Sequence, residues 1–410
     1  MPTFKQQLYN YAELAVKVGV NIQPNQYLYI SASTEAIEFV RLVTEIAYDT
    51  GSRQVFVDWN DDVVSRLRYE KAPADSFAEF PEWKVMEREL LAEQGAAFMS
   101  IVSQSPDLLK GIDPSRIGDS QKATGKALDK FRQSMQSDKV SWTVIATPSK
   151  AWAKKVFPDL PESDQTSALW EAIFKSVRAD KTDPVQSWID HDKKLHEKVD
   201  YLNEKRFHKL HYQAPGTDLT IELPEGHLWC GAGSLNEKGH AFMANMPTEE
   251  VFTVPLNTGV NGYVSSTKPL SYGGNIIDNF KITFKDGRVI AISAEQGEEV
   301  LQRLIDTDEG AKHLGEVALV PHNSPISQSG LLFYNTLFDE NASNHLALGS
   351  AYAFCVKNGK TMTRDELEKH GLNQSITHVD FMIGSEQMDI DGIHKDGTNE
   401  PVFRNGNWDF

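Results

Sequence analysis

In the first half of the chain, short apolar runs alternate with longer segments of helical periodicity. The runs are rich in β-branched and aromatic residues and predict strands at 27–30, 54–57, 98–102 and 140–145. Between the first two runs, a helix is predicted from Thr34 to near Gly51, on the apolar positions Ile37, Val40, Val43 and Ala47. This alternation of strands and helices favours a parallel sheet with flanking helices.

The second half has a different pattern. Residues 151–206 are charged and helix-prone, and predict a helical bridge that closes the first domain. Beyond them, 219–223, 280–284 and 289–292 predict strands, and Asp286-Gly287 favours a hairpin turn. We therefore expect an α/β N-terminal domain with a mostly parallel sheet and the helical bridge (1–206). A β-rich α+β catalytic domain (207–410) follows it.

Length and charge narrow the class of protein. At 410 residues the chain fits two domains of roughly 100 to 200 residues each. The start, MPTFKQQ, does not resemble a signal peptide, and no apolar stretch approaches the ~20 residues of a membrane span. A net charge of −17 argues against binding to nucleic acid or to an anionic membrane. We expect a cytoplasmic protein with a small, neutral or cationic substrate.

Several common site types are not supported by the sequence. Cys230 and Cys355 lack the spacing of a disulfide framework or a zinc ribbon, so we expect two reduced thiols. Phosphate-binding glycine motifs are missing, so no nucleotide cofactor is expected. The glycosylation patterns at Asn341 and Asn373 are interpreted as chance, because nothing else indicates a secretory compartment.

Imidazole and carboxylate side chains gather in the second half. Residues 376–383 alternate so that, on a strand, His378 and Asp380 project from one face and Val379, Phe381 and Ile383 from the other. The apolar face would anchor the strand and hold the polar pair in place. The alternative is an ordinary strand with a polar outer face.

A second cluster, 337–345, places Asp339, Glu340 and His345 after an apolar segment. If the segment from His345 is helical, Tyr352 lies close to two turns further on and shares its face. A phenol would then sit beside a candidate ligand. An ordinary capped helix with an exposed histidine is the alternative.

Two further acids lie where apolar runs begin. Glu316 precedes 317–320, and the pair Glu249-Glu250 precedes 251–254. Taken singly, such a glutamate is more often solvated than a ligand. Together with His378 and Asp380 they offer carboxylate and imidazole ligands, which suit Zn, Co or Mn.

Four segments in order then resemble one family. Residues 245–253, 314–320, 335–345 and 378–384 are similar to the M29 metallopeptidases, the group of aminopeptidase T, aminopeptidase S and PepS. The resemblance implies two divalent metal ions per chain, with Glu316 as the bridge, and Tyr352 as a catalytic side chain. The ligands that it implies are Glu250, Glu316, Glu340, His345, His378 and Asp380. It also implies a cytoplasmic homodimer that removes N-terminal residues from peptides.

The expected reaction is hydrolysis of an N-terminal peptide bond by water that two metal ions activate. Tyr352 could donate a hydrogen bond to the developing oxyanion, and Glu249 is a candidate general base. Two other classes stay open. One is a two-metal hydrolase of another small substrate such as a phosphoester, although the motifs lack the Arg and Lys that would clamp phosphate. The other is a non-enzymatic protein that binds metal or peptide.

Overall fold

A computed structural model describes residues 2–273 and 275–410, which form two compact units. One unit comprises Met1–Asp192 and Gly233–Thr248, and the other Lys193–Ala232 and Glu249–Phe410. The chain passes from the first to the second within helix α9 (Pro184–Lys205), upstream of the predicted domain boundary at 206/207. That boundary, as a division between functional domains, stays a prediction.

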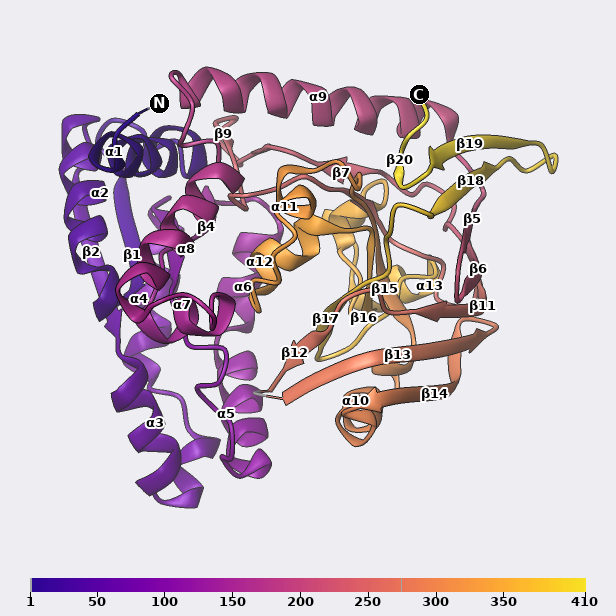
Figure 1. The fold of residues 1–410 in the computed structure, drawn as a ribbon, viewed down its shortest axis with the longest axis horizontal. Helices are drawn as coiled ribbons and strands as arrows, with labels where there is room; N and C mark the ends of the chain where they lie inside the picture. Colours follow the sequence, from indigo (N-terminus) through magenta and orange to yellow (C-terminus); the bar gives the residue numbers. More distant parts are fainter. Residues whose placement is uncertain (1, 274) are drawn as a thin grey trace. The chain divides into compact units, whose positions relative to one another are not determined.

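The first unit contains the parallel sheet that the sequence predicts, with strand order β2-β1-β3-β4. Figure 1 labels β1, β2 and β4 of this sheet. Its strands are β1 (Tyr27–Ser33), β2 (Gln54–Asn60), β3 (Ala97–Val102) and β4 (Trp142–Ala146). The inner strand β1 is buried along most of its length, as expected for a parallel sheet covered by helices. A small hairpin of β8 (Ser234–Leu235) and β9 (Ala241–Phe242) also belongs to this unit.

Helices make up most of the remainder of the first unit, and the predicted helical bridge is present as α7, α8 and α9. The helix expected after Thr34 is confirmed, and Gly51 follows it with a φ of 101°, a conformation that favours glycine. The elements are α1 (Phe4–Leu14), η1 (Ala15–Gly19), η2 (Thr34–Ala36), α2 (Ile37–Asp49), α3 (Asp62–Lys71), η3 (Ala74–Ala78), α4 (Glu82–Glu93), α5 (Pro114–Ala127), α6 (Asp129–Gln136), α7 (Lys150–Val156) and α8 (Glu162–Ser176).

The second unit is built on two antiparallel sheets, as the β-rich prediction requires. A five-stranded sheet has the order β17-β16-β15-β10-β7. Its strands are β7 (Cys230–Gly231), β10 (Val251–Thr253), β15 (Leu314–Leu319), β16 (His345–Gly349) and β17 (His378–Met382).

A larger sheet of nine strands has the order β12-β13-β11-β6-β5-β18-β19-β20, with β14 paired to β13. The predicted Asp286-Gly287 turn joins β13 to β14, and both residues have positive φ. The strands are β5 (Lys209–Ala214), β6 (Thr217–Glu222), β11 (Val260–Ser265), β12 (Leu270–Tyr272), β13 (Asn275–Lys285), β14 (Arg288–Gln296), β18 (Asp389–Ile393), β19 (Asn399–Arg404) and β20 (Asn407–Trp408).

Short helices connect the strands of this unit, which is therefore α+β as predicted. They are α10 (Glu298–Ile305), η4 (Gly310–Lys312), α11 (Pro325–Gln328), α12 (Thr336–Asp339), η5 (Glu340–Ala342), η6 (Ala353–Cys355), η7 (Gly359–Thr361) and α13 (Arg364–Lys369). Both cysteines are free thiols, as expected. In the described part of the chain, no helix combines the length and apolar character that crossing a bilayer requires.

The helix from His345 that would bring Tyr352 beside it is not present, because this segment is the central strand β16. Strand β16 lies between β15 and β17 and is buried on both faces, so it lacks the alternating pattern of a half-exposed strand. A short apolar run of this kind is compatible with either a buried strand or a buried helix. Tyr352 therefore cannot share a helical face with His345.

The two faces of the five-stranded sheet have opposite characters. One face carries apolar side chains into a large hydrophobic core, which the nine-stranded sheet also lines with residues such as Leu210 and Ile282. The contributions of the five-stranded sheet to this core are Val251, Leu314, Val317, Leu319, Leu346, Leu348 and Phe381. This burial fixes the register of the strands, because a slip by one residue would expose the whole apolar set.

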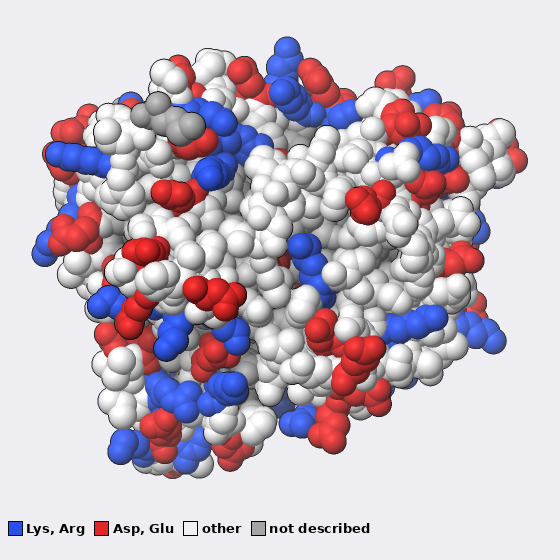
Figure 2. Space-filling view, in the orientation of Figure 1, with Lys and Arg blue, Asp and Glu red and all other residues white. Residues whose placement is uncertain are grey.

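One face of the molecular surface is strongly charged but not segregated by sign. On the face that Figure 2 shows, Lys and Arg are interspersed with Asp and Glu. The net charge of −17 is therefore not concentrated in one block on that face.

Candidate metal centre

The candidate ligands lie on the face of the five-stranded sheet opposite its core face. In the register, Glu316 on β15 pairs with Ala347 on β16, and Ala347 pairs with Asp380 on β17. Paired residues of an antiparallel sheet project to the same side, so His378 and Asp380 share a face as predicted. His345 lies on this side too, two residues before Ala347.

Small residues stand between the candidate ligands. Ala347 separates Glu316 from Asp380, Ala318 is paired with His345, and Gly349 is paired with His378. Gly349 has a φ of 114°, and a Cβ added there would lie 2.2 Å from the carbonyl oxygen of Thr377. These positions therefore leave room above the sheet for the longer acidic and imidazole side chains.

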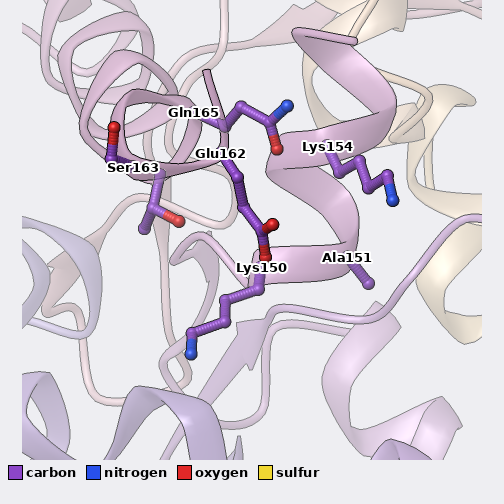
Figure 3. A pocket seen from close by; sticks show the side chains of 7 residues that line it. Lys150, Ala151, Lys154, Glu162, Ser163 and Gln165 are labelled. Atoms are coloured by element: carbon purple, nitrogen blue, oxygen red, sulfur yellow. The ribbon is translucent and has the colours of Figure 1, made fainter. Parts of the chain in front are cut away.

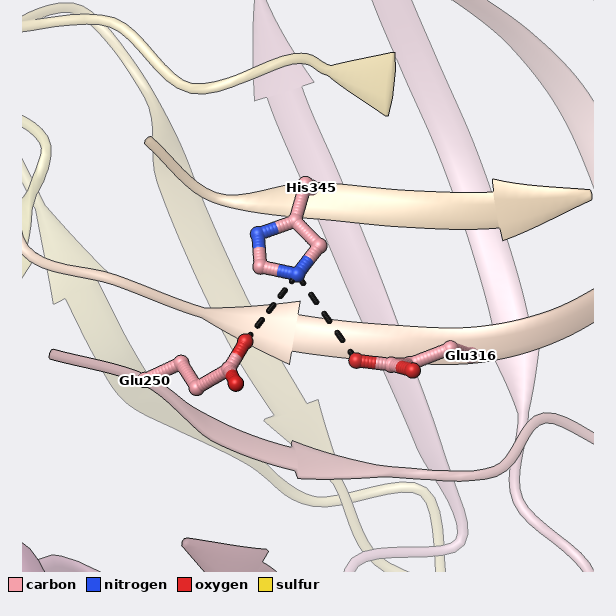
Figure 4. Close-up of side chains that lie close together, drawn as sticks. All are labelled: Glu250, Glu316 and His345. Carbon is pink, nitrogen blue, oxygen red and sulfur yellow. Dashed lines mark ion pairs between the residues drawn. The ribbon is translucent and has the colours of Figure 1, made fainter. Parts of the chain in front are cut away.

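Glu250, Glu316 and His345 converge in the centre of this face (Figure 4). His345 Nε2 lies 3.1 Å from Glu250 Oε2 and 3.7 Å from Glu316 Oε1. All three side chains are buried, and His345 is only 1% exposed. Glu250 directly precedes β10, where the alternation of the chain puts it on the same side as Phe252.

Glu316 also belongs to a second group. Its other oxygen, Oε2, lies 3.1 Å from His378 Nε2, and the same nitrogen lies 3.4 Å from Asp380 Oδ1. Each group of three offers ligand atoms within 4.8 Å of one another, a spacing that one ion could share. The two oxygens of Glu316 therefore face two different imidazoles.

The other ring nitrogen of each histidine is held by the main chain. His345 Nδ1 lies 3.1 Å from the carbonyl oxygen of Ser343, and His378 Nδ1 lies 2.7 Å from that of Ser350. A carbonyl only accepts, so each Nδ1 must carry the proton and donate it. Each Nε2 faces the carboxylates and can donate a proton to them in the metal-free site; once that proton is lost, its lone pair is the one that a metal-binding histidine uses.

Electrostatics make this arrangement costly without a cation. Burial raises the pKa of Glu250, and burial together with the charges of Glu250 and Asp380 raises the pKa of Glu340 well above its usual value. Burial alone would lower the pKa of His345, but its hydrogen bonds with Glu250 and Glu316 outweigh burial and raise that pKa well above normal. Without a cation, Glu250, Glu340 and His345 thus hold protons, which reduce the repulsion among the buried carboxylates.

The same competition shapes the second group. Burial would lower the pKa of His378, but the charge of Asp380 and hydrogen bonds to Asp380 and Glu316 raise it well above normal. Burial would raise the pKa of Asp380, yet the charge of His378 lowers it. Asp380 Oδ1 is buried, and His378 Nε2 lies 3.4 Å from it. A buried carboxylate oxygen in that position fits a metal ligand.

Asp339 and Glu340 are neighbours with different environments. The carboxylate of Asp339 accepts the backbone N–H groups of Phe333 at 2.8 Å and Asn335 at 2.9 Å, and burial raises its pKa to about 6. It therefore shapes the loop before α12. Glu340, in contrast, lies within electrostatic reach of Glu250 and Asp380.

Asn341 was not among the predicted site residues, although it ties the site together. Its Oδ1 accepts the backbone N–H of Glu249 at 2.6 Å, while its Nδ2 donates to Leu337 O at 3.0 Å and lies 3.5 Å from Glu340 Oε1. The side chain is completely buried, which is incompatible with a glycan at the Asn341-Ala342-Ser343 pattern. In the sequence, the signal that could have identified Asn341 as a site residue is its position next to Glu340.

Tyr352 reaches the site from the loop after β16. Its ring centroid lies 4.8 Å from that of His378, and burial and then the charge of Glu316 raise the pKa of its hydroxyl well above normal. The hydroxyl therefore stays protonated at neutral pH and can donate a hydrogen bond. Tyr352 is thus brought beside the candidate ligands, although by the loop after β16 rather than by a helix.

A separate hollow lies in the first unit and has no relation to these residues. It encloses about 640 Å³ between α7 and α8 (Figure 3). Its lining residues are Lys150, Ala151, Lys154, Glu162, Ser163, Gln165 and Thr166. None of the predicted site residues lines it, and its open, mixed-charge lining does not resemble the buried carboxylate and imidazole cluster of the second unit.

Comparison with known proteins gives matches over the whole chain. Residues 4–408 match the family described as thermophilic metalloproteases (M29). The aminopeptidase AmpS of Bacillus subtilis (strain 168) is 62% identical over 410 residues, with 100% of both chains covered. Aminopeptidase 2 of Geobacillus stearothermophilus is 51% identical, covering 100% of this chain and 99% of the relative.

A solved structure agrees with the fold as well. Wild-type AmpT from Thermus thermophilus superposes with a TM-score of 0.94 at 41% sequence identity, and the match covers 100% of both chains. The sequence match, the fold and the buried clusters of candidate ligands thus agree. The chain belongs to the M29 family of metalloproteases.

Proposed function

We propose that this metalloprotease is an aminopeptidase that hydrolyses N-terminal residues from peptides with two divalent metal ions. The observation that carries the two-metal proposal is the position of Glu316, whose oxygens face His345 and His378 separately. The aminopeptidase activity is inferred from full-length relatives that carry this name in Bacillus subtilis and Geobacillus stearothermophilus.

In this proposal, Glu250, Glu316 and His345 hold one ion, and Glu316, His378 and Asp380 hold the other. Glu340 is assigned as a further ligand, because its neighbour Asp339 is already engaged by backbone N–H groups. The four carboxylates carry four negative charges when ionised, which two divalent cations would balance. The oxygen and nitrogen donors suit Zn, Co or Mn.

Two bound cations would supply an activated water at neutral pH and would polarise the scissile carbonyl. The protein contributes the remaining groups. Tyr352 donates a hydrogen bond to the oxygen that becomes negatively charged, since its hydroxyl is protonated and its ring lies beside that of His378. Glu249, a buried acid whose backbone N–H is held by Asn341, is the proposed proton acceptor that returns the proton to the leaving amine.

Phosphoester hydrolysis is a weaker candidate. The ion pairs of Glu250, Glu316 and Asp380 in the described part of the chain are with histidines, and none of them brings in a Lys or Arg that could clamp a phosphate. A homodimer and a cytoplasmic location stay predictions that rest on the family resemblance. Size-exclusion chromatography with light scattering would test the dimer.

Metal removal tests the proposed function. Stripping the protein with a strong chelator is expected to abolish hydrolysis of leucine anilide, while far-UV circular dichroism stays unchanged because the strands are held by their backbone pairing and by the core on the other face. Adding Zn, Co or Mn should restore activity, and elemental analysis should give two ions per chain. Full activity after thorough stripping would contradict the proposal, as would hydrolysis of phosphate esters in place of anilides.

Metal uptake should also depend on pH. The pKa values of Glu250, Glu340, His345 and His378 are all raised in the metal-free site, so these groups hold protons that an ion must displace. The apparent affinity for metal is therefore expected to increase as the pH rises through these pKa values. Titration calorimetry in two buffers of different ionisation enthalpy would measure the protons released.

The small residues of the ligand face give a further prediction. Ala347→Val adds two methyl groups between Glu316 and Asp380, and is expected to lower metal content and to cost about 1–3 kcal/mol of folding stability through overpacking. Elemental analysis and thermal unfolding would measure both effects. Ala291→Val, on an exposed position of β14, is the matched control and should change neither. Normal metal content in Ala347→Val would argue against this placement of the ions.

A further inference from the structure

We infer that Phe252 and Phe354 form the subsite that binds the side chain of the N-terminal residue, and that this subsite selects large apolar side chains. The inference rests on the proposed aminopeptidase function and names the residue class that this function prefers. It concerns aromatic side chains that the metal chemistry does not use.

The two phenylalanines form a cluster with Tyr352. The ring centroid of Phe252 lies 6.0 Å from that of Tyr352 and 6.0 Å from that of Phe354, with edge-to-face geometry in both cases. The rings of Tyr352 and Phe354 are stacked at 5.2 Å. All three side chains are half-buried, so each keeps some apolar surface accessible.

The sheet register places this cluster beside the candidate ligands. Phe252 on β10 is paired with Ala318 on β15, and Ala318 is paired with His345 on β16, so Phe252 lies on the ligand face. Glu250 is two residues before Phe252, and Phe354 is two residues after Tyr352. One aromatic ring therefore lies beside the candidate ligands on the sheet, and the other lies on the loop that carries Tyr352.

The geometry of the substrate then sets where its first side chain must go. The scissile carbonyl has to lie between the candidate ligands and the Tyr352 hydroxyl, and the β-carbon of the N-terminal residue is only two bonds from that carbonyl carbon. The Tyr352 ring is in contact with both phenyl rings, and the inferred position of this side chain is therefore against Phe252 and Phe354.

The chemistry of this wall favours some residues over others. Leu and Phe side chains would cover the phenyl rings and lose apolar surface to water, which Ala cannot do. Asp and Glu would be desolvated against the rings and repelled by Glu250, Glu316 and Asp380. The expected order of kcat/KM is therefore Leu and Phe first, Ala lower, and acidic residues last.

The test compares kcat/KM for the anilides of Leu, Phe, Ala and Glu in the metal-loaded enzyme. In Phe252→Ala and in Phe354→Ala, the ratio of Leu to Ala is expected to fall roughly 10-fold, the typical effect of losing apolar contacts in a specificity pocket. Phe410→Ala is the control, because Phe410 is a half-buried aromatic residue of the same unit that packs on Tyr201 and Trp408. It should leave the ratio unchanged.

A purely structural role for the cluster predicts another result, namely that activity on all anilides falls together and their ratio stays constant. That outcome overturns the inference. If the alanine variants do not fold, Phe252→Leu and Phe354→Leu carry the test, and the ratio of Phe to Ala must then fall while activity on Ala anilide persists. If the wild-type enzyme cleaves no anilide when loaded with metal, the proposed function fails first, and the inference fails with it.

Discussion

Glu316→Gln is expected to leave the protein folded while it loses metal and almost all activity. Among the described residues, Glu316 is the one side chain that belongs to both groups of candidate ligands. The substitution therefore weakens the binding of both ions. Changing a side chain that merely supports a metal ligand typically lowers metal affinity or activity roughly 10- to 100-fold. For this carboxylate, a proposed ligand itself, we therefore expect a loss of more than ~100-fold. Kinetics on leucine anilide and elemental analysis of the purified variant would measure the two losses.

The fold should survive this change for an electrostatic reason. Glutamine keeps the shape of the side chain and removes one negative charge from a cluster that already raises the pKa of Glu250 and Glu340. Glu299→Gln is the matched control, since Glu299 lies on α10 in the same unit with its side chain 92% exposed. A Glu316→Gln protein with two ions and normal kcat would refute the bridging assignment.

Tyr352→Phe is expected to lower kcat by roughly 10²- to 10³-fold, the loss typical of removing one donor to an oxyanion. The change removes only the hydroxyl and keeps the ring that contacts His378 and Phe354. KM and metal content should therefore stay close to those of the wild type, because the hydrogen bond forms only as charge develops on the substrate oxygen.

Tyr263→Phe is the control for this experiment. Tyr263 lies on β11 in the same unit, is 38% exposed, and holds Lys281 over its ring at 3.8 Å. The Tyr263→Phe variant should have the kcat and KM of the wild type. If Tyr352→Phe raised KM and left kcat unchanged, the hydroxyl would serve in binding the substrate rather than in stabilising the oxyanion.

The larger features of the fold could be predicted from the sequence. The strand at 378–382 shows a strict alternation, and the structure has His378 and Asp380 on one face with Phe381 in the core. The hairpin at Asp286-Gly287 and the parallel sheet of the first unit also follow from local patterns. In each case the signal lies within a few residues of the chain, where side-chain alternation or turn chemistry is decisive.

The features that could not be predicted depend on contacts between distant segments. Strand β16 has apolar residues on both faces, and only its neighbours β15 and β17 show that it is a strand. The carbonyl oxygens of Ser343 and Ser350, which orient the two histidines, carry no sequence signal because every residue has a carbonyl. Glu340 is distinguished from Asp339 by the backbone N–H groups that occupy Asp339 and by its own nearness to Glu250 and Asp380.

The opposite characters of the two faces of the five-stranded sheet limit how this chain can change in evolution. A one-residue insertion within β15, β16 or β17 would exchange the faces beyond it, sending carboxylates into the core and Leu346 or Phe381 outward. Such an insertion disrupts the core and the site together, so selection would oppose it both for lost stability and for lost activity. Length changes can accumulate instead in the connections at 320–344 and 350–377, wherever they spare the side chains that those connections supply to the site.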